Sequence, residues 1–228
     1  MSEFNHPTQE MGDLMTMLEN LPEGKKIETA PCLHRRRHPV CVSLMFIASK
    51  VGMKFVQFGP KGHQIPDGGL HVGTVEERAE FGKQMMAIAE ENCKVSGGSV
   101  VISDDIECIK GATSSTPTCG MACTTRRSRA RTTWTCSTQV SVTMDMMNFA
   151  GPNSKFMHCL PATRNEEVVD EVMDDPERSL CWVEAENRKH SIRALLAALG
   201  KRTPLNDEGV EYSAKAELHA ALEALEQL

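Results

Sequence analysis

Apolar residues along the chain recur either at helical spacing or in short continuous runs. The first helical pattern covers residues 6–19, where the apolar positions are Met11, Leu14, Met15 and Leu18. Similar patterns predict helices at residues 42–53, 75–93, 166–173, 184–199 and 214–228. Short apolar runs predict strands at residues 54–58, 99–103, 155–159 and 179–183. Strands alternating with helices predict an α/β fold, with helices on both faces of a parallel sheet.

The last part of the chain carries two apolar stripes. The stripe on the helix at residues 184–199 consists of Ile192, Leu195, Leu196 and Leu199. The stripe on the helix at residues 214–228 consists of Leu218, Leu222 and Leu225. We expect two domains: residues 1–183 hold the sheet, and residues 184–228 form C-terminal helices. A terminal apolar stripe either packs on its own domain or docks on a neighbouring subunit.

Composition narrows the class of protein. The net charge of -6 argues against a general nucleic-acid-binding role. The longest apolar run, residues 40–48, is too short to cross a bilayer, and residues 1–20 lack the basic flank of a secretory signal. Nine cysteines without regular spacing are typical of a reducing compartment, so we expect a cytoplasmic protein.

Three short motifs stand out in a fixed order. They are His6-Pro7-Thr8-Gln9, His158-Cys159-Leu160-Pro161 and Glu184-Ala185-Glu186-Asn187-Arg188. Each alone is a weak signal, but their order and separations resemble the transcarbamylases, specifically the ornithine and putrescine carbamoyltransferases. Residues 156–168 are most similar to the putrescine enzymes. The resemblance implies the Rossmann-like second domain of that family, which binds the amine, and transfer of a carbamoyl group from carbamoyl phosphate to ornithine or putrescine.

The resemblance also implies roles for individual residues. His6 and Gln9 would contact the carbamoyl group, Cys159 and Leu160 would hold the incoming amine and the carbamoyl amino group, and Arg188 would bind carbamoyl phosphate. His158 and Cys159 would lie at the carboxyl end of a parallel strand, where ligands bind in such sheets. Without that joint order, His6 is a surface residue, Cys159 a buried thiol and Arg188 an exposed helix residue. No cofactor or metal is implied.

Two segments break the pattern where the family has further strands. Residues 29–39 read TAPCLHRRRHP, and residues 113–139 are rich in Thr, Ser, Cys and Arg without periodicity. Reading each segment displaced by one base permits Phe-Ile-Gly-Asp-Ala-Thr-Gln in the first and Asp-Val-Trp-Tyr-Gly in the second, as in the family. We interpret both as out-of-frame translation, which also accounts for the single tyrosine.

These departures change the functional expectation. The family's N-terminal phosphate-binding domain does not precede the first motif, and the amine-recognition loop falls within residues 113–139. We therefore expect this polypeptide by itself to be inactive. The family is trimeric, so a homotrimer or a complex with a full-length paralogue is the expected assembly. Whether the amine is ornithine or putrescine stays open.

Two alternatives belong to other functional classes. The chain could be a non-catalytic assembly partner of full-length carbamoyltransferase. It could instead bind metal through the segment from Cys32 to Cys41, which includes His34 and His38, or bind nucleic acid through the run from Arg126 to Arg131. The cysteine and histidine spacing matches no standard zinc finger, and we expect neither a metal site nor nucleic-acid binding.

Overall fold

A computed structural model describes residues 6–21, 23–24, 26–29, 32–34, 39–59, 61–62, 64–67, 74–109, 117–119 and 141–200. The chain divides into two compact units, Met1–Ser191 and Ile192–Leu228. The first unit holds the sheet and every side chain of the candidate site. In the described part of the chain, no helix is both long enough and apolar enough to cross a membrane.

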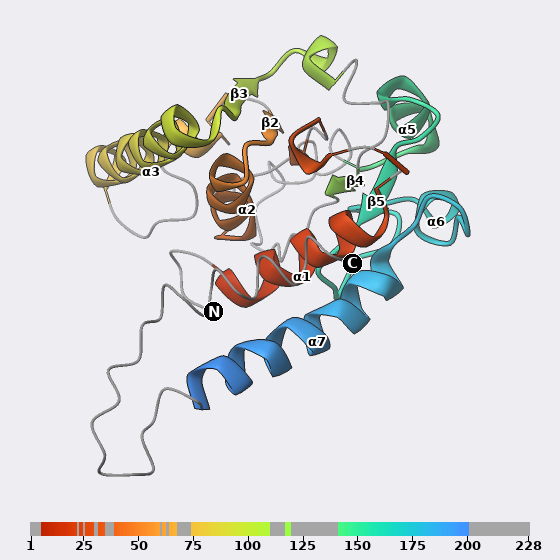
Figure 1. Cartoon of the computed structure of the whole chain (residues 1–228). Coiled ribbons are helices and arrows are strands. Elements are labelled where there is room, and N and C mark those ends of the chain that lie inside the picture. The colour runs from red at the N-terminus through yellow and green to blue at the C-terminus, as the bar shows by residue number, and fades with distance from the viewer. Residues whose placement is uncertain are drawn as a thin grey trace, which may run out of the picture. The chain divides into compact units, whose positions relative to one another are not determined.

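The first unit is built on a parallel sheet of five short strands, which confirms the α/β prediction (Figure 1). In chain order the strands are β1 (Cys32–His34), β2 (Lys54–Phe58), β3 (Ser99–Ser103), β4 (Pro117–Cys119) and β5 (Lys155–Met157). Their order across the sheet is β3-β2-β1-β4-β5, and every pair of neighbours is parallel. Since all strands run the same way, their carboxyl ends share one edge.

Helices flank this sheet. They are α1 (Pro7–Glu19), α2 (Pro39–Lys50), α3 (Val75–Ser96), α5 (Met144–Ala150), α6 (Asp170–Met173) and α7 (Cys181–Gly200), with 3-10 turns at Ile27–Thr29, Ile65–Asp67 and Ile106–Ile109. Helix α3 begins with a capping box between Thr74 and Glu77 and ends at Gly97, whose φ of 80° suits a left-handed cap.

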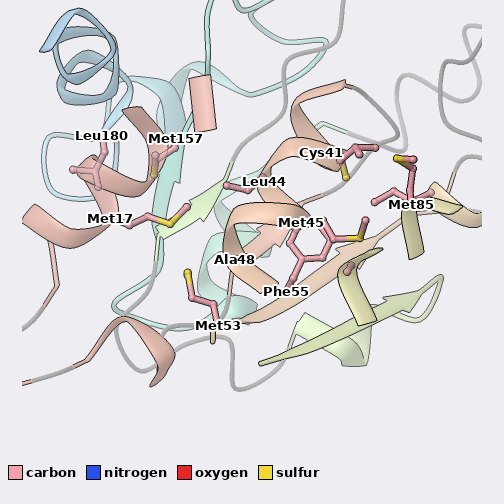
Figure 2. Packing of buried hydrophobic residues seen from close by; sticks show 13 residues of the cluster. Met17, Cys41, Leu44, Met45, Ala48, Met53, Phe55, Met85, Met157 and Leu180 are labelled. Carbon is pink, nitrogen blue, oxygen red and sulfur yellow. The ribbon is translucent and has the colours of Figure 1, made fainter. Parts of the chain in front are cut away.

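Successive residues of β2 show that both faces of the sheet are covered. Phe55 packs in a cluster with Leu44 and Met45 of α2 and with Met85 of α3 (Figure 2). The next residue, Val56, packs instead with the partly buried side chains of Met146 and Phe149 in α5. Because successive side chains of a strand point to opposite faces, α2 and α5 lie on opposite sides of the sheet.

Strands β1 and β4 fall inside the two segments that interrupt the sequence pattern, residues 29–39 and 113–139. Strand β1 pairs with β2 on one side and β4 on the other, and β4 pairs with β5. The α/β alternation required a strand at both places, and the backbone has one at both. The proposed frame displacement is a statement about the gene and stays a prediction.

Two sequence predictions near the end of the sheet were wrong. Residues 179–183 form no strand: Ser179 makes an isolated bridge to Phe156, and α7 begins at Cys181. Residues 166–173 are helical only over Asp170–Met173. A short apolar run fits a buried strand and the first turn of a buried helix equally well. Here Leu180 and Cys181 are buried as α7 begins, so burial rather than strand pairing explains the run.

Candidate active site

Helix α1 buries its polar face. Gln9, Asp13 and Thr16 are at most 1% exposed, whereas Leu18 of the predicted apolar stripe is 44% exposed. Met11, Leu14 and Met15 of that stripe are only half-buried. Burying an amide, a carboxyl group and a hydroxyl costs free energy unless each finds a partner. The interior of the protein must therefore be polar beside these three residues, although Met17 of the same helix is buried in the hydrophobic core.

Helix α7 supplies those partners by lying close against α1 (Figure 1). The Asn187 side chain donates hydrogen bonds to Thr16 Oγ1 at 3.0 Å and to Glu19 Oε2 at 2.6 Å. Gly12 permits the approach, because a Cβ atom there would lie 3.1 Å from the Cα atom of Arg188. A glycine and an asparagine thus set the distance between the first and third motifs.

Glu184 joins these helices to the loop that follows β5. Its Oε1 accepts a hydrogen bond from Gln9 Nε2 at 2.8 Å, and its Oε2 accepts one from the backbone N–H of His158 at 2.7 Å. Gln9 Nε2 also donates to Asp13 Oδ1 at 2.7 Å. One buried carboxyl group of the third motif therefore binds a residue of each of the other two motifs.

The loop itself is held by His158 and Glu167. The N–H of Leu160 donates to His158 Nδ1 at 3.0 Å, which places the imidazole proton on Nε2. That nitrogen lies 3.4 Å from Glu167 Oε2, without hydrogen-bond geometry. Glu167 Oε2 also accepts the N–H of Thr163 at 2.8 Å. These contacts support Leu160, which has the unfavourable φ of 47° for a branched side chain.

A cavity of about 560 Å³ opens between α1, α7 and this loop. Four of the five predicted site residues line it: Gln9, Cys159, Leu160 and Arg188. The remaining lining residues are His158, Pro161, Ala162, Arg164, Met173, Trp182, Glu184 and Ala185. The structure therefore brings together residues that are separated by more than a hundred positions in the sequence.

His6 does not line this cavity. It is the N-cap residue of α1 and is 7% exposed, and its backbone N–H donates to Ser43 Oγ at 2.6 Å. Burial, and then the positive charge of Arg188, lower the pKa of His6 from its ordinary value, so its imidazole is neutral at neutral pH. A neutral imidazole can donate one hydrogen bond without carrying charge into the site.

The cavity combines an arginine that pairs with no described acid and an un-ionised thiol. Arg188 makes no ion pair with the residues that the structure describes, whereas Arg164 is neutralised by Asp170 and Asp174. Burial, followed by the nearby Glu184 and Asp13, raises the pKa of the Cys159 thiol far above its ordinary range. Cys159 therefore stays a thiol, which suits a packing or hydrogen-bonding role and not nucleophilic attack.

Sequence reasoning assigned no role to Asp13, Glu167 or Glu184, although Glu184 begins the third motif. The available signal for Asp13 is its position four residues after Gln9, which places both side chains on one face of α1. Nothing in the local sequence indicates that this face is the buried one. Glu167 carries no signal at all, since it lies in a turn.

The structure gives no support to the metal alternative. Within the described ranges, no three His, Cys, Asp or Glu residues are grouped to hold a metal ion. Cys41, Cys93, Cys108, Cys159 and Cys181 form no disulfide bond. The side chains of Cys32 and His34, all of His38 and the run from Arg126 to Arg131 lie outside what the structure describes.

Comparison with known proteins gives the family. Residues 34–199 match the aspartate/ornithine carbamoyltransferase family, Asp/Orn binding domain. The chain is 33% identical over 205 residues to putrescine carbamoyltransferase of Mycoplasma mycoides, covering 86% of this chain and 52% of that protein. It is 33% identical over 200 residues to ornithine carbamoyltransferase of Pyrococcus horikoshii, covering 87% and 57%.

Solved structures agree. The ornithine carbamoyltransferase of Pyrococcus furiosus superposes with a TM-score of 0.69 at 32% identity, covering 86% of this chain and 56% of that one. The enzyme of Gloeobacter violaceus gives a TM-score of 0.66 at 31% identity, with 86% and 59% covered. This chain spans roughly half the length of the curated relatives it matches. With its three motifs gathered around one cavity, the chain belongs to the aspartate/ornithine carbamoyltransferase family, and most of it is that family's Asp/Orn binding domain.

Proposed function

We propose that this chain provides the amine-binding side of a carbamoyltransferase site, which moves a carbamoyl group from carbamoyl phosphate to ornithine or putrescine. The observation that carries the proposal is the meeting of Gln9, Cys159, Leu160 and Arg188 at one cavity. The relatives include both a putrescine carbamoyltransferase and an ornithine carbamoyltransferase, so both amines are candidate acceptors. Neither the assembly-partner alternative nor the metal- or nucleic-acid-binding alternative is favoured by these findings.

The reaction sets requirements that these residues can meet. A bond forms between the amine nitrogen and the carbamoyl carbon, the bond from that carbon to a phosphate oxygen breaks, and the amine loses a proton. Negative charge develops on the carbonyl oxygen and on the leaving phosphate, and both are stabilised by nearby donors and cations. In our proposal Arg188 offers the cation at the cavity. His6 lies outside the cavity lining, so its role as a donor to the carbonyl oxygen rests on the family resemblance alone.

Gln9, Cys159 and Leu160 orient the reactants in the same proposal. Gln9 reaches the carbamoyl group from α1, while Cys159 and Leu160 hold the amine from the loop after β5. That loop is fixed through Glu184 and Glu167, so its backbone is rigid before a ligand arrives. Preorganisation of this kind lowers the entropic cost of bringing two reactants together.

The wider assembly is also part of the proposal. We expect residues 184–228 to dock on another domain or subunit, because Leu196 is 63% and Leu199 is 49% exposed on α7. An exposed stripe of this kind marks an interaction surface. A homotrimer or a complex with a full-length paralogue would cover it. In the absence of such a partner, we expect the purified chain to form neither citrulline nor carbamoylputrescine, and turnover above a mock preparation would overturn that expectation.

Binding tests the site without requiring turnover. Trp182 lines the cavity and is 60% exposed, so its fluorescence should respond when carbamoyl phosphate and then ornithine or putrescine are added. Substituting Arg188→Ala should weaken carbamoyl phosphate binding by roughly 10-fold or more, the loss expected for a charge-assisted hydrogen bond. Lys189→Ala is the matched control, because Lys189 lies on the exposed face and pairs with Glu186. Equal binding by both variants would refute the assigned site.

A further inference from the structure

Two carboxyl groups, those of Asp13 and Glu184, lie together at the cavity and bind the same Gln9 amide nitrogen. We propose that Asp13 and Glu184 share a single proton in the folded protein, and that this pair fixes Gln9 with its amide nitrogen on the two carboxyl groups and its oxygen without a protein partner. The role toward a ligand rests on the proposed function. The shared proton does not, since it follows from the geometry of the empty protein.

The geometry brings the two acids close. Gln9 Nε2 donates to Asp13 Oδ1 at 2.7 Å and to Glu184 Oε1 at 2.8 Å, so one nitrogen atom bridges both carboxyl groups. Asp13 is fully buried and Glu184 is 1% exposed. Two negative charges at this separation and away from water repel strongly. One proton held between them removes that repulsion and leaves a single charge.

A buried oxygen atom without a hydrogen-bond partner supports the same shared proton. Asp13 Oδ2 is buried and has no hydrogen-bond partner among the described residues, although Oδ1 is paired. Both oxygens of Glu184 already accept hydrogen bonds, from Gln9 and from the His158 backbone. A carboxyl proton on Glu184, directed at Asp13, would satisfy the remaining Asp13 oxygen. Buried polar atoms are rarely left without a partner.

The other charged and titratable groups around the pair do not replace that proton. Arg188 on α7 offsets part of the negative charge, but Glu10 on α1 adds to it. His158 turns its backbone N–H toward Glu184, while its ring nitrogen faces Glu167. Cys159 stays a neutral thiol, His6 a neutral imidazole, and Lys50 of α2 acts on Glu10. Of these groups, Arg188 is therefore the cation that acts on both Asp13 and Glu184, whereas Lys50 acts on Glu10.

The direction of the pKa shifts of Asp13 and Glu184 agrees with a proton held by the pair. Burial raises the pKa of Asp13 to about 6, and burial together with the neighbouring Asp13 raises the pKa of Glu184 well above its ordinary value. The folded protein therefore holds a proton at neutral pH that the unfolded chain releases. Since the folded pKa is raised, this contribution to stability is complete below about pH 4 and is lost as the pH rises through the folded pKa values.

The same pair decides the orientation of Gln9. Carboxyl oxygens beside Gln9 accept hydrogen bonds, so the amide must present its NH2 group to them. The amide oxygen is then buried and left without a partner among the described residues, on a side chain that lines the cavity. A ligand group that reaches this oxygen would meet an acceptor whose orientation is already fixed. The pair thus acts as a positioning device for Gln9, and its carboxyl groups need not contact the ligand.

Asp13→Asn tests the shared proton because an asparagine imitates the protonated pair. Its oxygen can accept from Gln9, and its NH2 group can donate to an ionised Glu184. Glu10 has a pKa raised to about 7 by burial and by Asp13, so it titrates in the same range and must first be removed as Glu10→Gln. In that background, the unfolding equilibrium constant should rise up to roughly 10-fold per pH unit between pH 5 and 8.

Adding Asp13→Asn to Glu10→Gln should abolish most of that pH dependence and make the protein at least as stable at pH 8. Asp13→Leu, which removes the acceptor and supplies no donor, should instead destabilise the protein at every pH. Glu186→Gln is the matched control, because Glu186 is an exposed acid on the same helix. An Asp13→Asn variant that keeps the full pH dependence would overturn the shared proton.

Proton release on unfolding directly counts the extra protons that the folded protein holds. At pH 7 the Glu10→Gln protein should release on the order of one proton per chain when urea unfolds it, and the double variant almost none. Release that is equal in the two proteins would also overturn the proposal. Neither measurement uses a ligand, so a negative result would not contradict the proposed carbamoyltransferase function. Conversely, a lack of Trp182 response to carbamoyl phosphate would not contradict the shared proton.

Hydrogen exchange tests the orientation of Gln9. Its side-chain NH2 protons, assigned by their loss in Gln9→Met, should exchange with water at least about 10-fold more slowly than those of the exposed Gln84, because both are held by buried carboxyl groups. Asp13→Asn should preserve that protection, and Glu184→Ala should reduce it. Exchange as fast as Gln84 in the unmodified protein would refute the fixed orientation.

Discussion

Asn187 should be the residue that holds α7 against α1. Its Nδ2 donates to Thr16 Oγ1 at 3.0 Å and to Glu19 Oε2 at 2.6 Å, and the side chain is buried. Asn187→Ala removes both hydrogen bonds. The next residue, Arg188, lies with its backbone against Gly12, so the position of the cavity's cation depends on this contact. The substitution therefore tests how the site is supported.

The magnitude follows from the state of each partner. The hydrogen bond to the neutral Thr16 hydroxyl contributes about 1 kcal/mol. A bond to a carboxylate contributes about 1.5–3 kcal/mol when buried, but Glu19 is exposed and regains water, so the lower end applies. Thr16 keeps its own bond to the carbonyl of Gly12 at 2.8 Å and is not left unsatisfied. The total loss should be about 2.5 kcal/mol.

Urea unfolding followed by circular dichroism measures this loss. With an m-value of about 2 kcal/mol per molar, the midpoint should fall by about 1 M while m stays constant. Lys189→Ala, on the exposed face of the same helix, should change the midpoint by less than a quarter of that. A double-mutant cycle with Thr16→Val should give a coupling of about 0.5–1 kcal/mol. An Asn187→Ala midpoint that matches Lys189→Ala would refute the argument.

Three further predictions concern the same region. Gly12→Val should lower stability by about 1–3 kcal/mol in thermal unfolding, because even a Cβ would lie 3.1 Å from Arg188 Cα; unchanged stability would show that the helices can separate. Gln9→Glu should be less stable than Gln9→Met at pH 8, with the difference shrinking toward pH 5, since it adds a third carboxyl group where Gln9 now donates to two; a difference independent of pH would contradict this. Cys159 should react with iodoacetamide at pH 8 at least about 10-fold more slowly than a peptide cysteine, as peptide mass spectrometry can measure, because burial raises its thiol pKa; an equal rate would contradict its assignment as an un-ionised thiol.

The sequence predicted those parts of the fold whose own residues carry a clear pattern. Strands β2 and β3 begin and end at the predicted residues, since short apolar runs between turn residues indicate strands. Helix α3 was predicted over residues 75–93 from its apolar spacing, and it extends three residues further, to Ser96. Strands β1 and β4 are different: their residues carry no strand pattern, and only the need of the α/β alternation for strands at those places indicated them.

Only the site residues that belong to the three sequence motifs could be predicted from the sequence. Gln9, Cys159, Leu160 and Arg188 were found through the family resemblance, and the structure brings these four together. The resemblance also named His6, which lies three residues before Gln9 but does not line the cavity. Asp13 and Glu167 could not be found this way, since their importance depends on burial. Apolar periodicity even indicated the wrong face of α1, because the buried face carries Gln9, Asp13 and Thr16 beside Gly12 and Met17.

That inversion has a thermodynamic consequence. A helix that buried its apolar stripe would gain stability from the hydrophobic effect, whereas α1 buries Gln9, Asp13 and Thr16 and leaves Leu18 exposed. Buried acids with raised pKa values oppose folding as the pH rises, so the site is maintained at the expense of stability. Asp13→Asn should therefore stabilise the protein at neutral pH while keeping its hydrogen bonds. A substitution that improves stability at a buried, fully hydrogen-bonded position indicates that the native residue is there for function.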